Sequence, residues 1–227
     1  MLKAITFDLD NTLIDFMAMK RKASDAAAKE MVKHGLRMNI KEAKKKLFEF
    51  YMKEGIEGNL TFTKFLKINN AYSDLAVAFA LNAYTLQKDQ FMKPYRGTEQ
   101  ALIKLKKLNL KLGLISDAPK LKMYQRLETM KLTKYFDEIL GYEDTGKKKP
   151  SKLPFIKILK LLKVKPKEAM HVGDNPQRDM KGAKSIGMKT CLATYGQVIK
   201  ARASQDFKIN SILDIPKIAK AIIQKGL

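Results

Sequence analysis

Between Pro94 and the C-terminus, short apolar runs alternate with longer segments of helical periodicity. The apolar runs, which we interpret as strands, are residues 111–115, 138–140, 169–172, 190–193 and 207–209. The segments of helical periodicity are residues 98–108, 120–130, 154–162, 178–186 and 215–224. Short apolar strands that alternate with helices are typical of a parallel sheet covered by helices on both faces. The pattern therefore predicts an α/β fold with a doubly wound, mostly parallel sheet.

The N-terminal 92 residues contain one strand-like run and then a long helical block. Residues 2–10 form a short apolar run that ends in carboxylates, as a buried strand does when it delivers polar residues at its end. After this run, plausible helices with no strand between them cover residues 16–34, 40–53, 61–70 and 72–88. We therefore expect an α/β core domain, residues 1–15 and 93–227, that is interrupted by an all-helical domain, residues 16–92.

The composition excludes several classes of protein. Hydrophobic residues make up 45% of the 227 residues, which is too many for an intrinsically disordered chain. The single cysteine, Cys191, excludes a disulfide framework, and we expect it to be inert in its apolar strand. No apolar run is long enough for a transmembrane helix, and the chain reaches Asp8 before a signal-peptide core could form. We expect a cytoplasmic protein that does not contact a membrane.

The chain is strongly basic, because 45 Lys and Arg against 23 Asp and Glu give a net charge of +22. Such a charge favours nucleic-acid binding, or else reflects lysine-rich helix faces that attract small anions. The densest basic stretch, residues 147–167, has apolar residues at helical spacing among its lysines, as an amphipathic surface helix has. Since no nucleic-acid recognition motif is present, we expect a solvated face and no specific nucleic-acid partner. A basic nucleic-acid-binding protein is the alternative from another functional class.

Polar residues gather where the predicted strands end. They are Asp8 to Thr12 after the first strand, Ser116 and Asp117 after the second, the lysines 147–149, and Asp174 and Asp179 after strand 169–172. In an open parallel sheet, ligands bind at the carboxyl ends of the strands. Carboxylates at this edge would coordinate Mg²⁺, while a hydroxyl and an ammonium group would hold phosphoryl oxygens.

In their order along the chain, these segments resemble the four motifs of the haloacid-dehalogenase-like (HAD) hydrolase superfamily. The matches are Asp8, Asp10 and Thr12 for D-x-D-x-T, Ser116 for the strand-end Ser/Thr, Lys149 before Pro150 for the Lys motif, and Gly173, Asp174 and Asp179 for G-D-x-x-x-x-D. The resemblance extends over nearly the whole chain. It implies a Rossmann-like core, and it implies that the helical insertion is a cap that follows the first motif.

The resemblance also implies a Mg²⁺-dependent phosphatase that works through an aspartyl-phosphate. Asp8 would be the nucleophile and Asp10 the general acid and base. Ser116, Lys149 and the backbone N–H groups around Leu9 to Asn11 would hold the transferring oxygens. The metal would be bound by Asp8, Asp174 and the main-chain carbonyl of Asp10, with Asp179 as a ligand or as support for the metal shell or Lys149.

Several of these residues have a purely structural alternative. Ser116 could cap a helix that begins near Pro119. Asp179 could be an N-terminal helix residue that the helix dipole favours. Asp117 could stabilise its turn instead of contacting substrate. Lys147, Lys148 and Lys152 compete with Lys149 for the site, and the register of the motif favours Lys149. We expect His171 to be packed inside its strand and not to be catalytic.

Other reactions of the superfamily are the remaining alternatives. Dehalogenases need no metal and lack the second aspartate of the first motif, so Asp10 and Asp174 favour a phosphatase. Phosphomutases share all four motifs. We expect the cap to select among small sugar or acid phosphates, such as phosphoglycolate or glyceraldehyde 3-phosphate, in a protein that is a monomer or a homodimer. The expected substrate-binding residues are Leu9, Asn11, Thr12 and Asp117, with Lys20 and Arg21 in the cap.

Overall fold

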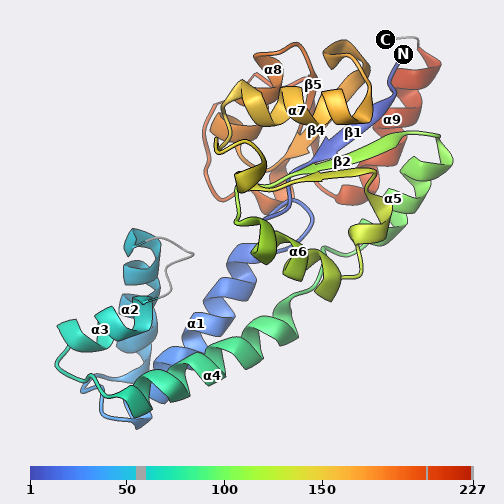
Figure 1. Cartoon of the computed structure of the whole chain (residues 1–227). Coiled ribbons are helices and arrows are strands. Elements are labelled where there is room, and N and C mark those ends of the chain that lie inside the picture. The colour runs from blue at the N-terminus through green and yellow to red at the C-terminus, as the bar shows by residue number, and fades with distance from the viewer. Residues whose placement is uncertain (55–59, 203, 226–227) are drawn as a thin grey trace. The chain divides into compact units, whose positions relative to one another are not determined.

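The computed structural model describes residues 1–54, 60–202 and 204–225 (Figure 1). The chain divides into two compact units. One unit comprises Met1–Asp15 together with Lys93–Leu227, and the other comprises Phe16–Met92. The first unit contains the sheet, and the second contains helices, so we describe each by itself.

The α/β unit is built on a six-stranded sheet in the order β3-β2-β1-β4-β5-β6. The strands are β1 (Ala4–Phe7), β2 (Lys111–Ile115), β3 (Glu138–Leu140), β4 (Ala169–Gly173), β5 (Lys189–Ala193) and β6 (Phe207–Ile209). All neighbouring strands run parallel, which confirms the predicted fold class. The strand order reverses between β1 and β4, and such a switch point is where open α/β sheets bind ligands at the carboxyl ends of the strands.

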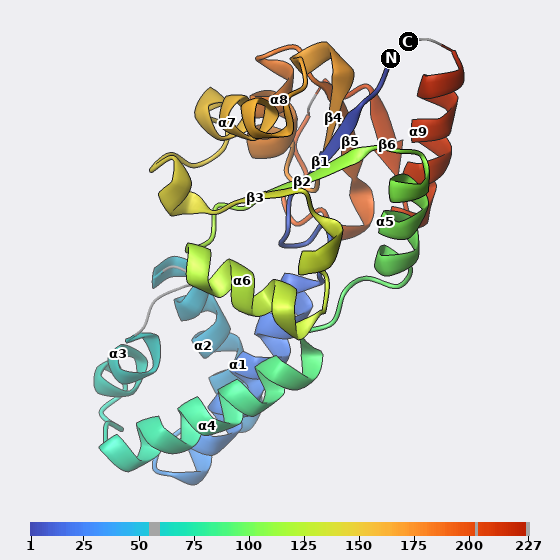
Figure 2. The same ribbon diagram turned by 45° about the vertical axis from the view of Figure 1, so that its right-hand side comes forward.

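Helices cover both faces of this sheet, with α7 and α8 on one face and α5 and α9 on the other (Figure 2). The helices of the unit are α5 (Thr98–Lys107), α6 (Lys120–Thr129), α7 (Lys152–Leu162), α8 (Lys181–Lys184) and α9 (Ile215–Gln224). Shorter turns of 3₁₀ helix are η1 (Thr133–Tyr135), η2 (Tyr142–Asp144), η3 (Pro166–Glu168), η5 (Thr194–Gly196) and η6 (Ile212–Asp214). Because both faces are covered, all four residues of β1 are buried.

The predicted helix 178–186 is the element that differs most from expectation. The chain instead forms a π-helical turn, η4 (Pro176–Met180), which continues directly into the short α8. The Asn175 side chain accepts hydrogen bonds from the backbone N–H groups of Gln177 and Arg178, so helical structure begins before residue 178. Gly187, at φ 84°, ends it in the left-handed conformation.

The lysine-rich α7 has one apolar face and one basic face. Phe155, Ile158 and Leu162 belong to the buried core cluster of the α/β unit. Lys152 and Lys160 of the same helix are exposed. Helical spacing of apolar and basic residues therefore produces a solvated face here, as the sequence pattern predicts.

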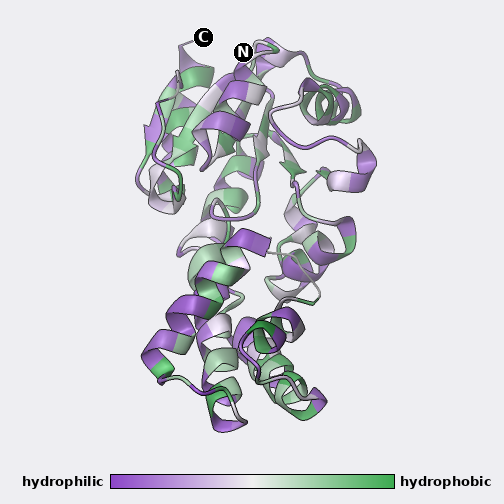
Figure 3. Ribbon diagram, turned by 90° about the vertical axis from the view of Figure 1, so that its left-hand side faces the viewer, coloured by the Kyte–Doolittle hydropathy of each residue, from purple (hydrophilic) through white to green (hydrophobic). Residues whose placement is uncertain are grey.

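The second unit consists of α1 (Phe16–Lys33), α2 (Ile40–Glu54), α3 (Thr61–Ile68) and α4 (Asp74–Phe91). Helix α1 packs against α2 and α4, and the buried core of the unit includes Met31, Leu47 and Leu66. Hydrophilic and hydrophobic residues alternate in bands along the helices (Figure 3), as is typical of helices with one buried face. Across the described part of the chain, every helix is too short or too polar to span a lipid bilayer.

Candidate active site

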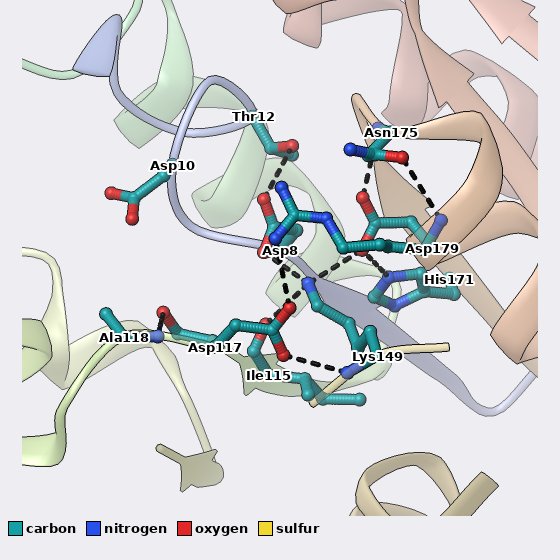
Figure 4. A network of polar contacts seen from close by, with 12 residues as sticks. Asp8, Asp10, Thr12, Ile115, Asp117, Ala118, Lys149, His171, Asn175 and Asp179 are labelled. Atoms are coloured by element: carbon teal, nitrogen blue, oxygen red, sulfur yellow. Dashed lines mark hydrogen bonds and ion pairs between the residues drawn. The ribbon is translucent and has the colours of Figure 1, made fainter. Parts of the chain in front are cut away.

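The chain turns sharply after β1, and this turn places Asp8 and Asp10 in different surroundings. The backbone N–H of Asp8 donates to the carbonyl of Val172 on β4 at 2.9 Å, so Asp8 still follows the sheet. The Leu9 carbonyl then accepts from the N–H groups of Thr12 and Leu13 at 3.3 and 2.9 Å, which closes a tight loop. Asp8 consequently lies at the switch point of the sheet, while Asp10 lies on the loop beyond it (Figure 4).

Lys149 joins two buried carboxylates. Its Nζ contacts Asp8 Oδ1, lies 2.6 Å from Asp179 Oδ1, and donates to the Ile115 carbonyl at 3.2 Å. The Lys149 side chain is 2% exposed, whereas Lys147 and Lys148 are exposed, so the structure brings Lys149 into the cluster as the motif register predicts. Burial alone would lower the pKa of Lys149, but the charges of Asp179 and Asp8 outweigh burial and raise it.

Asp179 is held from several sides. Its carboxylate accepts from the backbone N–H of Asn175 at 3.0 Å and lies 3.3 Å from His171 Nε2. The other ring nitrogen of His171 is 2.8 Å from the Thr6 hydroxyl. A Cβ added at Gly173 would lie 2.4 Å from Asp179 Cγ, so only glycine leaves room for this carboxylate. Burial raises the pKa of Asp179, but Lys149 and His171 outweigh it and hold the pKa below its usual range.

The surroundings of Asp8 and Asp174, the other two carboxyl groups of the cluster, disfavour their charged forms. Burial, reinforced by Asp179 and Asp174, raises the pKa of Asp8 well above its usual value despite the opposing charge of Lys149. Burial, reinforced by Asp179, raises the pKa of Asp174 to about 7. One ammonium group therefore does not compensate the negative charge of the site.

A divalent cation fits this donor set. Ligand oxygens of Asp8, Asp174 and Asp179 all lie within 4.8 Å of one another, and carboxylate oxygens are the ligands that hard cations prefer. A bound cation would relieve the repulsion that raises the pKa values of Asp8 and Asp174. The Asp10 side chain is not part of this group, because its Oδ2 lies 2.6 Å from Arg126 Nη1.

Ser116 and Asp117 follow β2 at the same edge of the sheet. The Ser116 hydroxyl accepts from the backbone N–H of Ala118 at 3.2 Å, two residues on, within the turn that precedes α6. The alternative that Ser116 caps this helix is therefore wrong, since Pro119 occupies the cap position. Asp117 accepts from the backbone N–H of Lys149 at 2.9 Å and lies 3.3 Å from Arg178 Nη1, so it holds the turn that presents Lys149.

The remaining predicted residues divide between the two units. Thr12 donates from its hydroxyl to Asp8 Oδ2 at 3.4 Å. Lys20 and Arg21 lie on α1 in the helical unit. The buried Lys20 Nζ donates to the hydroxyls of Tyr51 and Tyr84 at 2.9 and 2.7 Å, and the Arg21 guanidinium lies 3.9 Å from the ring centre of Phe48.

Sequence reasoning missed three residues that contact the loop after β1. Arg126 on α6 reaches Asp10, as described above. The Tyr195 hydroxyl donates to the Thr12 carbonyl at 2.7 Å, and Gly196 packs so closely that an added Cβ would lie 1.5 Å from the Asn11 carbonyl oxygen. In the sequence Arg126 is one of many basic helix residues, so only its burial distinguishes it.

Comparison with known proteins gives consistent matches. A family model described as haloacid dehalogenase-like hydrolase matches residues 5–193. The glyceraldehyde 3-phosphate phosphatase of Pyrococcus furiosus is 32% identical over 197 residues, covering 86% of this chain and 82% of that protein. The phosphoglycolate phosphatase of Aquifex aeolicus is 30% identical over 217 residues, covering 96% of each. The crystal structure of a putative β-phosphoglucomutase from Thermotoga maritima matches with a TM-score of 0.76 at 18% identity, over 97% of this chain and 100% of that one, which shows a shared fold alone.

Proposed function

Because the chain belongs to the haloacid dehalogenase-like hydrolase family and is a hydrolase of phosphate monoesters, we propose that its substrates are small sugar or acid phosphates. Glyceraldehyde 3-phosphate and phosphoglycolate are the first candidates, since relatives that match most of this chain are named for them. The observation that carries the proposal is the buried cluster at the sheet switch point, in which Lys149 lies between Asp8 and Asp179.

In the proposed reaction, an Asp8 carboxylate oxygen attacks phosphorus and the bond from phosphorus to the leaving oxygen breaks. Asp10 gives its proton to the leaving oxygen, so the product leaves as an alcohol. Water then attacks the aspartyl-phosphate as Asp10 takes up a proton from it, which releases inorganic phosphate and restores Asp8. The Ser116 hydroxyl, the Lys149 ammonium group and the backbone N–H groups from Leu9 to Asn11 hold the phosphoryl oxygens.

Asp8, Asp174 and the main-chain carbonyl of Asp10 would hold Mg²⁺, with Asp179 supporting them. The ion supplies positive charge that reduces the repulsion between the nucleophile and the phosphate. Lys149 does part of the same work from within the protein, because its ammonium group lies against Asp8 and Asp179 and offsets part of the negative charge that the phosphate meets. A dehalogenase mechanism would leave both the proton donor Asp10 and the buried Asp174 without a role.

The test is turnover of a panel of phosphate monoesters with Mg²⁺, by the full chain and by Asp8→Asn. We expect Asp8→Asn to lose activity at least about a thousandfold, because the nucleophilic oxygen is removed while the shape is kept. Asp89→Asn, at an exposed aspartate of the helical unit, is the matched control and should keep full activity. A folded Asp8→Asn variant that retains more than about a thousandth of the activity would exclude Asp8 as the nucleophile.

A further inference from the structure

The Arg126 guanidinium is a buried charge that the proposed mechanism does not use. Its side chain is 5% exposed on α6, and Nη1 lies 2.6 Å from Asp10 Oδ2. Burying a charge is unfavourable unless a partner of opposite charge compensates it, so the ion pair with Asp10 helps to stabilise this arginine. The two residues are 116 positions apart in the sequence, and both belong to the α/β unit.

The Asp10 side chain points in a different direction from the carboxylates of Asp8 and Asp179. Figure 4 shows the Asp10 side chain pointing away from the cluster formed by Asp8, Lys149 and Asp179. In phosphoryl transfer the attacking and leaving oxygens lie roughly in line on opposite sides of phosphorus. A proton donor for the leaving oxygen must therefore be kept apart from the nucleophile, although Asp10 follows Asp8 by only two residues.

We propose that Arg126 is the positioning residue for Asp10, an inference that rests on the proposed function. The ammonium group of Lys149 and a bound divalent cation would both attract the Asp10 carboxylate toward Asp8. Arg126 supplies the opposing attraction from α6, and its N–H donates to Oδ2 of Asp10, which accepts this hydrogen bond also when Oδ1 carries the proton. Arg126 therefore holds the carboxyl group on the side of the leaving oxygen. Arg126 thus acts on the reaction through Asp10 and does not itself contact the reacting atoms.

This role has a kinetic signature that depends on the leaving group. The value of kcat/KM reports the steps up to release of the alcohol, and an alkoxide leaving group needs a proton whereas p-nitrophenolate does not. Misplacing Asp10 should therefore slow hydrolysis of an alkyl phosphate and spare kcat/KM for p-nitrophenyl phosphate. Hydrolysis of the aspartyl-phosphate also uses Asp10, so p-nitrophenol should appear in a burst before a slow steady state.

The experiment compares Arg126→Met and Arg126→Lys with the wild-type chain on glycerol phosphate and on p-nitrophenyl phosphate. We expect Arg126→Met to lower kcat/KM for the alkyl substrate by about tenfold to a hundredfold, and to change the aryl value less than about threefold. Arg126→Lys keeps a cation and should recover part of the loss. Lys134→Met removes a charge from the exposed residue 134 just beyond α6 and should change neither value.

Three outcomes would overturn the inference. Equal losses on both substrates by a folded Arg126→Met variant would mean that Arg126 only supports the fold. A gain on the alkyl substrate would mean that the ion pair holds Asp10 away from the leaving oxygen. The third outcome concerns the double variant Asp10→Asn with Arg126→Met. If its ratio of kcat/KM between the aryl and the alkyl substrate is larger than that of Asp10→Asn alone, Arg126 does not act through Asp10.

Failure of this inference is distinguishable from failure of the proposed function. Suppose that Asp8→Asn is inactive and that Arg126→Lys is as active as wild type on both substrates. If Arg126→Met then loses activity equally on both substrates, only the positioning role is wrong. If Asp8→Asn retains activity, the proposed function itself is wrong. Circular dichroism confirms the fold of each variant, and Arg126→Lys keeps the test decisive if Arg126→Met does not fold.

Discussion

At the level of single residues, Lys149 holds together a cluster that contains more carboxylates than ammonium groups. One ammonium group lies among the carboxylates of Asp8, Asp174 and Asp179, and all four side chains are buried. Removing an ammonium group from such a cluster leaves like charges facing one another at low dielectric. Removing one carboxylate has the opposite effect, because the raised pKa of Asp8 shows that the folded state disfavours its charge.

Lys149→Met should therefore destabilise the protein as well as inactivate it. In the absence of metal we expect the free energy of unfolding to fall by about 3–5 kcal/mol, the range found when one partner of a buried ion pair is removed. Lys148→Met, at the exposed neighbouring lysine, should change it by less than about 0.5 kcal/mol. Asp8→Asn should be inactive without loss of stability. Urea unfolding of the three variants measures the changes in stability, and equal stability of the two lysine variants would contradict the prediction.

The residues of this site that could be predicted either follow a strand end in the sequence or, like Lys149 and Asp179, match the register of a motif. Asp8, Ser116 and Asp174 follow buried strands directly, so apolar runs point to them. Arg126 contacts a residue 116 positions away, and nothing in the sequence of its own helix identifies Asp10 as its partner. A pattern in one sequence cannot specify a contact that only the packing of α6 creates.

At the level of elements, the loop after β1 is fixed by the turn η5 that follows β5. The Tyr195 hydroxyl bonds the Thr12 carbonyl, and Gly196 lies against the Asn11 carbonyl. The Tyr95 ring meets the Tyr195 ring edge to face, with the ring centres 4.8 Å apart. Backbone groups of this loop are proposed to hold the phosphoryl oxygens, so their placement depends on η5.

Gly196→Ala should displace the loop that carries Asp8 and Asp10. The added Cβ would lie 1.5 Å from a backbone oxygen, which cannot move aside as the end of a side chain can. We expect a loss of kcat of at least about tenfold in a protein that still folds, since small displacements of reacting groups have large effects on rate. Tyr195→Phe removes one hydrogen bond and should have a smaller effect. Wild-type activity of Gly196→Ala would show that the loop is not held from this side.

Cys191 on strand β5 should make the protein less stable as the pH rises into the alkaline range. Burial and Asp214 raise the pKa of the Cys191 thiol from 9.0 to about 12. Between pH 9 and 12 the unfolded chain therefore loses this proton while the folded chain keeps it, so stability falls as the pH rises. In Cys191→Ala, unfolding by urea should depend less steeply on pH in this range, by about 1.4 kcal/mol per pH unit. Parallel pH profiles for the variant and the wild type would contradict the raised pKa.

The strands were easier to predict than the helix boundaries for a physical reason. Strands 111–115, 138–140 and 207–209 have the predicted bounds. Strand 111–115 lies inside the parallel sheet and is buried from Leu112 to Ile115, so it stands out as an apolar run. Strands 138–140 and 207–209 lie at the edges of the sheet and are only partly buried, but each still contains two apolar residues. The start of the segment 176–184 is set by two backbone hydrogen bonds that the Asn175 side chain accepts and by a π-helical turn, and neither leaves an apolar period in the sequence.

At the level of the whole molecule, every residue that we propose to be catalytic lies outside the helical insertion. Asp8, Asp10, Ser116, Lys149 and Asp174 all belong to the α/β unit, whereas residues 16–92 form a unit with its own buried core. We propose that these residues are a cap that selects the substrate, with Lys20 and Arg21 as the candidate contacts. The two parts of the reaction, phosphoryl transfer and substrate choice, should then be separable by mutation.

Replacing residues 16–92 by a short linker tests this separation. Hydrolysis of p-nitrophenyl phosphate should survive in part, because every proposed catalytic residue remains. The ratio of kcat/KM between glyceraldehyde 3-phosphate and phosphoglycolate should move toward one, because the residues proposed to select the substrate are gone. Circular dichroism must first show a folded α/β unit, and the full chain with Lys20→Met and Arg21→Met offers the same comparison without the deletion. Unchanged preference in both would place selectivity in the α/β unit, where the loop held by η5 and the ion pair of Arg126 would then have to provide it.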